Sequence, residues 1–383
     1  MIWAAGAVLL RAWLLSPEVC PQVSAGEAVA DARAAAAWMA RVQEPDGSYL
    51  YEFDLDKNEQ VPGYNAVRHA GVTMALYQLA AAGEASSLPA ADRGLAWMRA
   101  RLYEHDGWAA IRDDAGGVET GGSALLLAGL AQRRLATGDT AYDDFMRQVG
   151  RFLVVMQQDD GSFLLNYDIH AGAPDPSERS KYATGEAFWS LTLMHRAFPG
   201  EGWDVAARRT ADYLSLRRDT VEGQNFPPWA DQWAAYGLAE MADWPLDDAN
   251  VAYARALAER FGFLVRVESQ RTDGVLSKLF HGRRSRGAGM GTWSEALDSL
   301  WRLSGADPRL ADLRDEIGER AACAAGMLHE RQLSAEDAAD TKNPPVAEGA
   351  WFTEGLTRMD DQQHSLSGLL RSAAILDERK RPR

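Results

Sequence analysis

A turn built around an Asp-Gly pair recurs along this chain and constrains its fold more than any other feature. Residues 43–49, 103–108 and 157–163 are close copies of the turn, and residues 270–276 are a weaker copy. Asp bonds its own backbone and Gly adopts positive φ angles, so the pair favours a tight reversal. The apolar residues before these turns have helical spacing, and strand-like alternation is nearly absent. The recurrence therefore predicts a series of helical hairpins.

Two kinds of helix alternate between the turns. Six segments begin polar or glycine-rich and become strongly apolar helices of small residues, at residues 64–79, 119–130, 181–194, 229–241, 291–303 and 359–376. Six amphipathic helices precede them in turn, at residues 26–42, 91–102, 142–157, 205–217, 251–267 and 310–332. Each hairpin can bury its apolar face only against its neighbours. The sequence therefore predicts an all-α fold, an (α/α)6 toroid of six helical hairpins, with an open helical solenoid as the alternative.

The toroid is expected to form a single domain over residues 26–383, behind an N-terminal apolar segment over residues 1–25. Residues 1–15 are too short to span a bilayer and lack the basic start of a signal peptide. We expect a helix packed on the body of the protein, with a degenerate export signal or anchor as the alternative. The sequence leaves the cellular location open, with a slight preference for the cytoplasm.

Two of the hairpins resemble the Gln–Trp repeat of the terpenoid cyclase and prenyltransferase toroids. Residues 38–49 (Trp-x4-Gln-x3-Gly-x-Tyr) and residues 152–163 (Phe-x4-Gln-x3-Gly-x-Phe) carry the pattern, with Tyr49 and Phe163 in place of the final Trp. The Asp-x-Asp-Asp motif of the protonating cyclases and the Cys–His zinc set of the prenyltransferases do not appear. The polar, aromatic-rich starts of the inner helices also resemble those of six-hairpin glycosidases, uronate lyases and sugar epimerases. These resemblances imply the double-ring fold and no single family.

Charge and cysteine content exclude several kinds of partner and site. The 40 basic and 55 acidic residues give a net charge of −15, which opposes nonspecific binding to nucleic acid or anionic lipid. No apolar run is long enough for a stable membrane span. Cys20 and Cys323 are too few for a disulfide framework or a Cys-rich zinc site, and no cofactor motif is present. The expected partner is a carbohydrate or another small polar substrate, and the oligomeric state stays open.

Chemistry is expected at the first turn of each inner helix, because the N-termini of these helices converge on a central funnel in a toroid. Their positive dipole ends suit carboxylates and electron-rich ligands. The first inner helix begins with Tyr64, Asn65, Arg68 and His69. Tyr64 and His69 are candidates for proton transfer, and Asn65 and Arg68 are candidates for substrate binding. A structural ion pair between Arg68 and a neighbouring helix is the alternative.

The third and fourth inner helices supply the carboxylates of the predicted site. Glu186 starts an apolar stretch, and burial there would raise its pKa toward that of a general acid. Asp231 follows two prolines and is a candidate base, with N-capping as the alternative. Flat aromatic faces stack on the apolar faces of sugars. The neighbouring residues expected to bind substrate are Lys181, Tyr182, Trp229 and Trp233.

The other inner helices add one polar pair and several supporting residues. Asp361 and His364 lie three residues apart in the sixth inner helix, and we assign Asp361 to catalysis and His364 to substrate binding. No second histidine lies at ligand spacing, so no metal site is predicted. The second and fifth inner helices contribute the substrate-binding candidates Glu119, Trp293 and Glu295.

The favoured function is that of a carbohydrate-active enzyme that hydrolyses a glycosidic bond in the funnel with two separated carboxylates. One alternative is a uronate lyase or C5-epimerase, in which Tyr64 and His69 move a proton while Arg68 neutralises the substrate carboxylate. The others are a noncatalytic glycan-binding or scaffold toroid and an isoprenoid cyclase-like enzyme, which needs a deep apolar cavity. Pairing of Arg68 with Glu119 would favour hydrolysis, whereas Arg68 without an acid partner would favour uronate chemistry.

Overall fold

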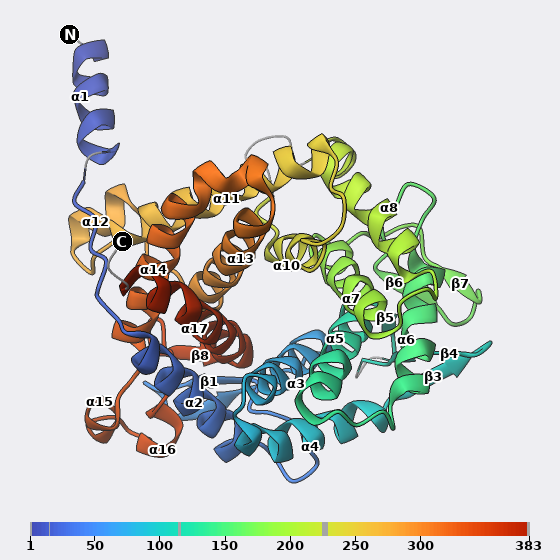
Figure 1. Cartoon of the computed structure of the whole chain (residues 1–383). Helices are drawn as coiled ribbons and strands as arrows, with labels where there is room; N and C mark the ends of the chain where they lie inside the picture. The colour runs from blue at the N-terminus through green and yellow to red at the C-terminus, as the bar shows by residue number, and fades with distance from the viewer. Residues whose placement is uncertain (1, 15, 114–115, 224–228, 381–383) are drawn as a thin grey trace.

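The computed structural model describes residues 2–14, 16–113, 116–223 and 229–380 and confirms the predicted toroid (Figure 1). The inner ring consists of α3 (Ala66–Ala81), α5 (Thr120–Thr137), α7 (Ala183–Ala197), α10 (Gln232–Glu240), α13 (Gly287–Ala306) and α17 (Met359–Lys380). The outer ring consists of α2 (Ala25–Arg41), α4 (Leu88–Arg99), α6 (Asp143–Met156), α8 (Trp203–Leu216), α11 (Asp248–Ser269) and α14 (Arg314–Arg331). Each of the twelve predicted helices corresponds to one of these helices. Shorter helices in the connections are α9 (Arg218–Val221), α12 (Val275–Phe280), α15 (Ala335–Ala339) and α16 (Pro344–Ala347), with 3-10 turns at Ala85–Ser87 and Pro308–Leu313.

Small residues let neighbouring inner helices approach closely. A methyl group at Gly129 of α5 would lie 3.4 Å from the Met74 Cα atom of α3. A methyl group at Gly368 of α17 would lie 3.0 Å from the Gly291 carbonyl oxygen of α13. Larger side chains at these crossings would push the helices apart, because protein interiors are already close-packed. The glycines of the inner helices therefore set the diameter of the ring.

A glutamine at the end of three outer helices ties its hairpin to the next outer helix. Gln43 Nε2 donates to a carbonyl of α4 at 3.0 Å, and Gln157 Nε2 donates to a carbonyl of α8 at 2.9 Å. Gln332 Nε2 donates to a carbonyl of α2 at 2.9 Å, which joins the last hairpin to the first. The glutamines of the Gln–Trp-like pattern thus connect consecutive repeats, and Gln332 closes the ring.

The two best copies of the Asp-Gly turn also contact the next outer helix. Gly47 and Gly161 have φ angles of +93° and +92°. A Cβ atom at Gly47 would collide with the Arg93 carbonyl of α4, and one at Gly161 would collide with the Arg209 carbonyl of α8. Both the backbone conformation and the close approach therefore require glycine at these turns.

Short antiparallel strands link the hairpins. One sheet has the order β2 (Glu59–Val61), β1 (Glu52–Asp54), β8 (Leu356–Arg358); β3 (Leu102–His105) pairs with β4 (Trp108–Ile111); and a third sheet has the order β5 (Val118–Glu119), β6 (Asn166–Asp168), β7 (Ala173–Pro174). In the first sheet Glu52 lies opposite Arg358. This register fixes the residues just before α17 beside the first hairpin, at the end of the ring where the inner helices begin.

The N-terminal helix α1 (Ile2–Leu14) differs from the expected packed helix because it projects from the body (Figure 1). Trp3 is 90% exposed, and every other described side chain of α1 is exposed too. Among the helices that the structure describes, none is long and apolar enough to cross a membrane. A disulfide between Cys20 and Cys323 fastens the segment after α1 to α14.

Candidate active site

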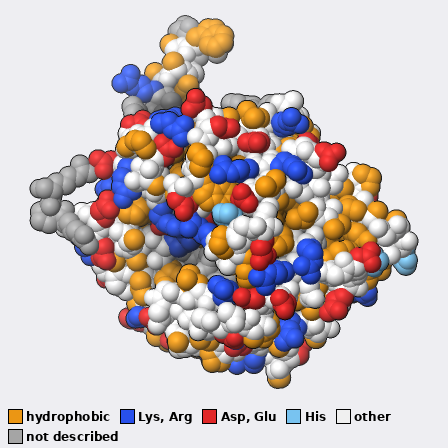
Figure 2. All heavy atoms as spheres, turned by 45° about the vertical axis from the view of Figure 1, so that its right-hand side comes forward, with side chains coloured by type: hydrophobic (Ala, Val, Ile, Leu, Met, Phe, Trp, Pro, Cys, Tyr) orange, Lys and Arg blue, Asp and Glu red, His pale blue; other side chains and the backbone are white. Residues whose placement is uncertain are grey.

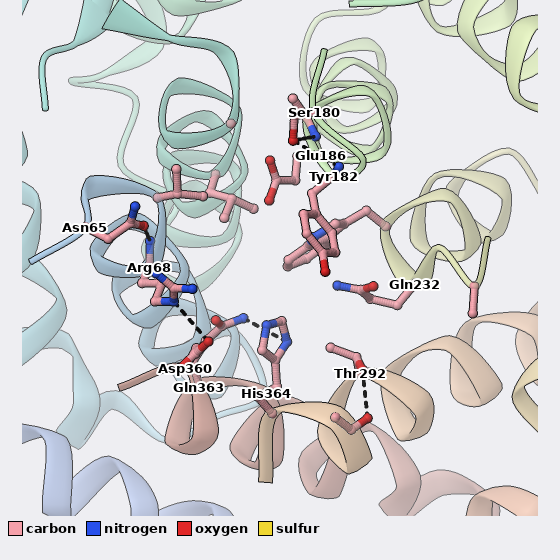
Figure 3. Close-up of a pocket in the computed structure, with 18 of the residues that line it drawn as sticks. Asn65, Arg68, Ser180, Tyr182, Glu186, Gln232, Thr292, Asp360, Gln363 and His364 are labelled. Atoms are coloured by element: carbon pink, nitrogen blue, oxygen red, sulfur yellow. Dashed lines mark hydrogen bonds and ion pairs between the residues drawn. The ribbon is translucent and has the colours of Figure 1, made fainter. Parts of the chain in front are cut away.

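The first turns of the inner helices surround a cavity of about 700 Å³ (Figure 3). Nine of the predicted site residues line it: Asn65, Arg68, Glu119, Tyr182, Glu186, Trp229, Trp233, Trp293 and His364. Apolar side chains, among them Val67, Leu125 and Leu264, fill the space between the polar groups. A cavity of this size with a few convergent polar groups is typical of small-molecule sites.

Glu186 and Glu119 bring two carboxyl groups to this cavity. Glu186 lies in the first turn of α7, is 4% exposed and projects into the cavity (Figure 3). Burial raises the pKa of Glu186 to about 8, helped by the negative charges of Glu119 and Asp231. Burial also raises the pKa of Glu119, and Asp113 adds to the effect. Because neighbouring carboxylates resist joint ionisation, the proximity of Glu119 helps Glu186 to keep its proton at neutral pH.

A histidine–carboxylate pair forms a second polar group of the cavity. His364 Nδ1 lies 2.9 Å from Glu295 Oε2 and 3.2 Å from Gln363 Nε2. Glu295 is fully buried behind the histidine. Burial lowers the pKa of His364, but the charge and hydrogen bond of Glu295 outweigh it and raise this pKa above its ordinary value. A buried carboxylate at one ring nitrogen orients the imidazole and makes the other nitrogen a stronger base.

Two arginines share one carboxylate at another part of the wall. Arg68 Nε donates to Asp360 Oδ2 at 3.0 Å, and Arg358 Nη2 donates to the same oxygen at 2.9 Å. Arg358 Nε donates to Asp360 Oδ1 at 2.7 Å, and Arg68 Nη1 donates to Tyr51 Oη at 3.1 Å. All three charged residues line the cavity. The acid partner of Arg68 is therefore Asp360 of the neighbouring inner helix α17, which is the ion pair set out as the alternative to substrate binding, and not Glu119.

Aromatic rings form the wall next to Glu186. Tyr182 meets Trp229 edge to face at 5.4 Å between ring centroids, and Lys181 Nζ lies 5.1 Å from the centroid of Trp229. Trp233 stacks on Trp189 at 5.5 Å and lies 5.7 Å from the ring of His364. Lys181 itself does not line the cavity. Its position beside Trp229 makes it a support for the aromatic wall.

Tyr64 and His69 contact each other but lie outside the cavity. The Tyr64 hydroxyl is 2.6 Å from His69 Nδ1, and His69 Nε2 is 2.9 Å from the Gly94 carbonyl oxygen. The His69 ring stacks on Trp97 at 4.1 Å, between α3 and α4. Burial lowers the pKa of His69 to about 3, so the ring is neutral, donates from Nε2 and accepts from Tyr64. This arrangement is a structural contact, and our proposals give the pair no catalytic role.

Asp231 and Asp361 are also held in structural contacts. Asp231 caps α10 by accepting from the Ala234 N–H at 3.1 Å and forms a buried ion pair with Arg218. Asp361 accepts from Arg286 Nη2 at 2.6 Å and from the backbone N–H groups of Ala288 and Arg358 at 3.0 and 2.9 Å. Neither carboxylate lines the cavity. Both carboxylates are held by an arginine and by at least one backbone N–H group, so we assign neither of them to proton transfer.

Seven further lining residues received no site role from the sequence. Four belong to the polar helix starts noted there, namely Gln232, Arg358, Asp360 and Gln363, and the other three are Ser180, Arg260 and Thr292. Most lie within one or two residues of a predicted position. The polar helix starts therefore predicted where the cavity lies, but not which side chain of each start points into it. Arg260 lies in the outer helix α11, and the inner-helix pattern carries no signal for it. Within the described residues, no group of three or more His, Cys, Asp or Glu side chains is arranged to hold a metal ion.

Comparisons with known proteins agree on the fold. No family model and no curated protein matches the chain. A cellobiose 2-epimerase from Spirochaeta thermophila superposes with a TM-score of 0.62 at 12% identity, over 93% of this chain and 97% of that one. A GH76 alpha-mannanase from Bacteroides thetaiotaomicron gives 0.60 at 10% identity, over 92% and 96% of the two chains. A type II terpene cyclase from Scytonema gives 0.55 at 13% identity, over 92% of this chain and 99% of that one.

These matches place the chain among the (α/α)6 toroids that include six-hairpin glycosidases and terpene cyclases. Its distant structural relatives are enzymes, most of them active on sugars. Identities this low establish the fold and leave the activity to be argued from the site.

Proposed function

We propose that this protein is a carbohydrate-active enzyme that hydrolyses a glycosidic bond in its central cavity by general acid–base catalysis. The observation that supports this best is the buried Glu186 carboxyl group, whose pKa of about 8 keeps it protonated at neutral pH. A carboxylic acid that retains its proton can donate it to the oxygen of a leaving sugar. Hydrolysis of a glycosidic bond needs one such acid and one ionised carboxylate.

Glu119 is the proposed base. It starts α5, lines the same cavity as Glu186 and does not use its side chain to cap the helix. In the proposed reaction Glu186 gives its proton to the glycosidic oxygen as the bond to the anomeric carbon breaks. Glu119 takes a proton from the water whose oxygen forms the new bond to that carbon. Glu119 thus replaces Asp231, the base expected from the sequence.

The aromatic wall suits a sugar ring in this position. Tyr182, Trp229, Trp233 and Trp293 line the same cavity as the acid. Aromatic faces contact the C–H groups of a pyranose, while Asn65 and Gln232 can bind its hydroxyls. Three guanidinium groups and several carboxylates in the wall are a poor match for a hydrocarbon substrate, which disfavours an isoprenoid cyclase.

The direct test is a panel of oligosaccharides and aryl glycosides, assayed with the wild type and with Glu186→Gln. Loss of general acid catalysis should lower kcat by roughly 10²- to 10⁴-fold. Glu201→Gln removes an exposed carboxylate that does not line the cavity and serves as the matched control. Equal turnover by the wild type and Glu186→Gln on an established substrate would refute the assignment, and a panel without any product would favour a binding protein.

A second candidate reaction is proton abstraction from a carbon next to a carbonyl or carboxylate, as in an epimerase or lyase. The pair of His364 with the buried Glu295 favours it, because His364 is a cavity residue with an orienting carboxylate. His364 would take the place of Tyr64 and His69, which lie elsewhere. Turnover in D₂O separates the two reactions, since an epimerase incorporates deuterium at carbon, a lyase gives an unsaturated product and a hydrolase does neither.

A further inference from the structure

The wall around Asp360 carries more positive than negative charge. Arg68 and Arg358 both donate to the Oδ2 atom of Asp360, so one carboxylate serves two guanidinium groups. The adjacent Arg286 is already neutralised by Asp361, its own partner. The side chains of Arg68 and Arg358 remain 32% and 25% exposed, at the cavity. Two like charges held this close with a single counter-charge attract a second anion.

Donor groups on both arginines remain available for such an anion. A guanidinium has five N–H donors, and the contacts with Asp360 and Tyr51 use two groups of Arg68 and two of Arg358. The unused N–H groups can bind a planar carboxylate with two parallel hydrogen bonds. Over the whole cavity, the three guanidinium groups of Arg68, Arg260 and Arg358 outnumber the carboxyl groups of Glu119 and Asp360, and the third carboxyl group, that of Glu186, keeps its proton at neutral pH. The cavity is thus positive within a chain of net charge −15.

We infer that the Arg68–Arg358 pair binds the carboxylate of a uronic acid, so that the substrate is an acidic sugar. This inference rests on the proposed function and specifies its substrate class. In Figure 3 the Arg68–Asp360 pair and Glu186 lie on different sides of the cavity, so the carboxylate of a sugar can be held away from the acid that protonates the glycosidic oxygen. Arg68 has an acid partner, but Arg358 shares that carboxylate, so Asp360 leaves a net positive charge for the substrate.

The charge outside the cavity limits the length of such a substrate. Figure 2 shows Asp and Glu side chains interspersed with Lys and Arg over the face that it presents, without a broad basic surface. A long polyuronate would meet repulsion from a chain with 15 more acidic than basic residues. A terminal uronate residue or a short oligosaccharide meets the positive pair without that cost.

Binding measured without turnover tests the inference. Calorimetry on Glu186→Gln would compare glucuronic, galacturonic and mannuronic acid di- and trisaccharides with the neutral sugars that carry CH₂OH in place of the carboxylate. We expect at least one acidic sugar to bind roughly ten- to a hundredfold more tightly than its neutral counterpart, the value of a charged hydrogen-bonded pair. Adding Arg358→Gln should remove most of this preference, and Arg358→Lys should restore part of it.

Two controls separate the arginine pair from a general effect of charge or folding. Arg260→Gln removes a guanidinium from the same cavity and should leave most of the preference, because Arg260 does not share Asp360. A folding defect would weaken acidic and neutral sugars alike, so the ratio of the two affinities is the readout. Equal binding of acidic and neutral sugars, or equal binding of sulfated and carboxylated sugars, would overturn the inference.

The experiments distinguish failure of the uronate inference from failure of the proposed hydrolysis. Hydrolysis of a neutral glycoside, lost in Glu186→Gln and without any preference for uronates, would support the proposed function and overturn the uronate inference. Tight uronate binding that depends on Arg358, without any hydrolysis by the wild type, would support the inference and overturn the function.

Discussion

Replacement of Glu186 by Gln should stabilise the protein at neutral and alkaline pH and leave its stability unchanged at low pH. Burial, with the charges of Glu119 and Asp231, raises the pKa of Glu186 from 4.5 to about 8. The unfolded chain therefore loses this proton near pH 4.5, whereas the folded chain keeps it until about pH 8. Between these values the unfolded state binds fewer protons, so the free energy of unfolding falls as the pH rises. Gln has no proton to lose and avoids this fall.

The size of the effect follows from the two pKa values of Glu186. At about 1.4 kcal/mol for each pH unit between them, the wild type loses roughly 3 kcal/mol by pH 7 and roughly 5 kcal/mol above pH 8. At pH 4.5 both side chains are mostly neutral and similar in shape, so the two proteins should agree within about 1 kcal/mol. The same substitution is expected to lower kcat by roughly 10²- to 10⁴-fold, which is the usual trade between stability and activity at a functional site.

Urea denaturation of both proteins at pH 4.5, 6, 7 and 8.5 measures this difference directly. Glu201→Gln is the control, because hydrogen bonds from Arg147 lower the pKa of Glu201 and its loss should not stabilise the protein at any pH. A stability difference between Glu186→Gln and the wild type that is constant with pH would show that Glu186 titrates normally. The argument for Glu186 as a general acid at neutral pH would then fail as well.

Three further predictions concern residues around the cavity and the chain ends. Asp231→Asn should lower the free energy of unfolding by about 3 kcal/mol, because it leaves the buried Arg218 short of a counter-charge, yet the folded variant should keep the wild-type kcat. Glu295→Gln should lower the pKa of His364 in an NMR titration, because the ring loses its anionic partner. Cys323→Ser should cost about 2–4 kcal/mol of stability, and a reductant should lower the melting temperature of the wild type but not of this variant.

The double ring could be predicted from the sequence because its signals are local and repeated. Each Asp-Gly turn marks a reversal of the chain, and each helix of small residues marks a member of the inner ring. The twelve helices can therefore be recognised from patterns of a few residues. The projection of α1 could not be predicted in this way. An apolar helix normally packs, and only the three-dimensional structure shows that α1 has no body surface beneath it. The disulfide between Cys20 and Cys323 joins residues 303 positions apart, and no local sequence pattern predicts it.

The candidate site could be predicted as a region but only in part as a set of residues. Side chains at consecutive positions of a helix point about 100° apart. A shift of one residue therefore decides whether a side chain lines the cavity or packs against a neighbouring element. Asp360 lines the cavity while Asp361 binds Arg286, and the sequence pattern assigns both to the same polar cluster. Arg68 was expected at the cavity and lies there, but its partner comes from α17, the last inner helix. Such a partner depends on ring closure, which only the whole fold provides.

The capping preferences of Asp and Glu distinguish carboxylates that cap a helix from carboxylates that are free to line the cavity. Asn and Asp are strong N-caps because their short side chains reach the backbone N–H groups of the first turn, whereas Glu is a poor cap. Asn65 and Asp231 do cap α3 and α10, and Asp231 is thereby withdrawn from the cavity. Glu119 occupies the same position of α5 without capping it, and Glu186 lies in the first turn of α7. A Glu at or just after the start of an inner helix is therefore not withdrawn by capping, which is why we propose Glu119 rather than Asp231 as the base.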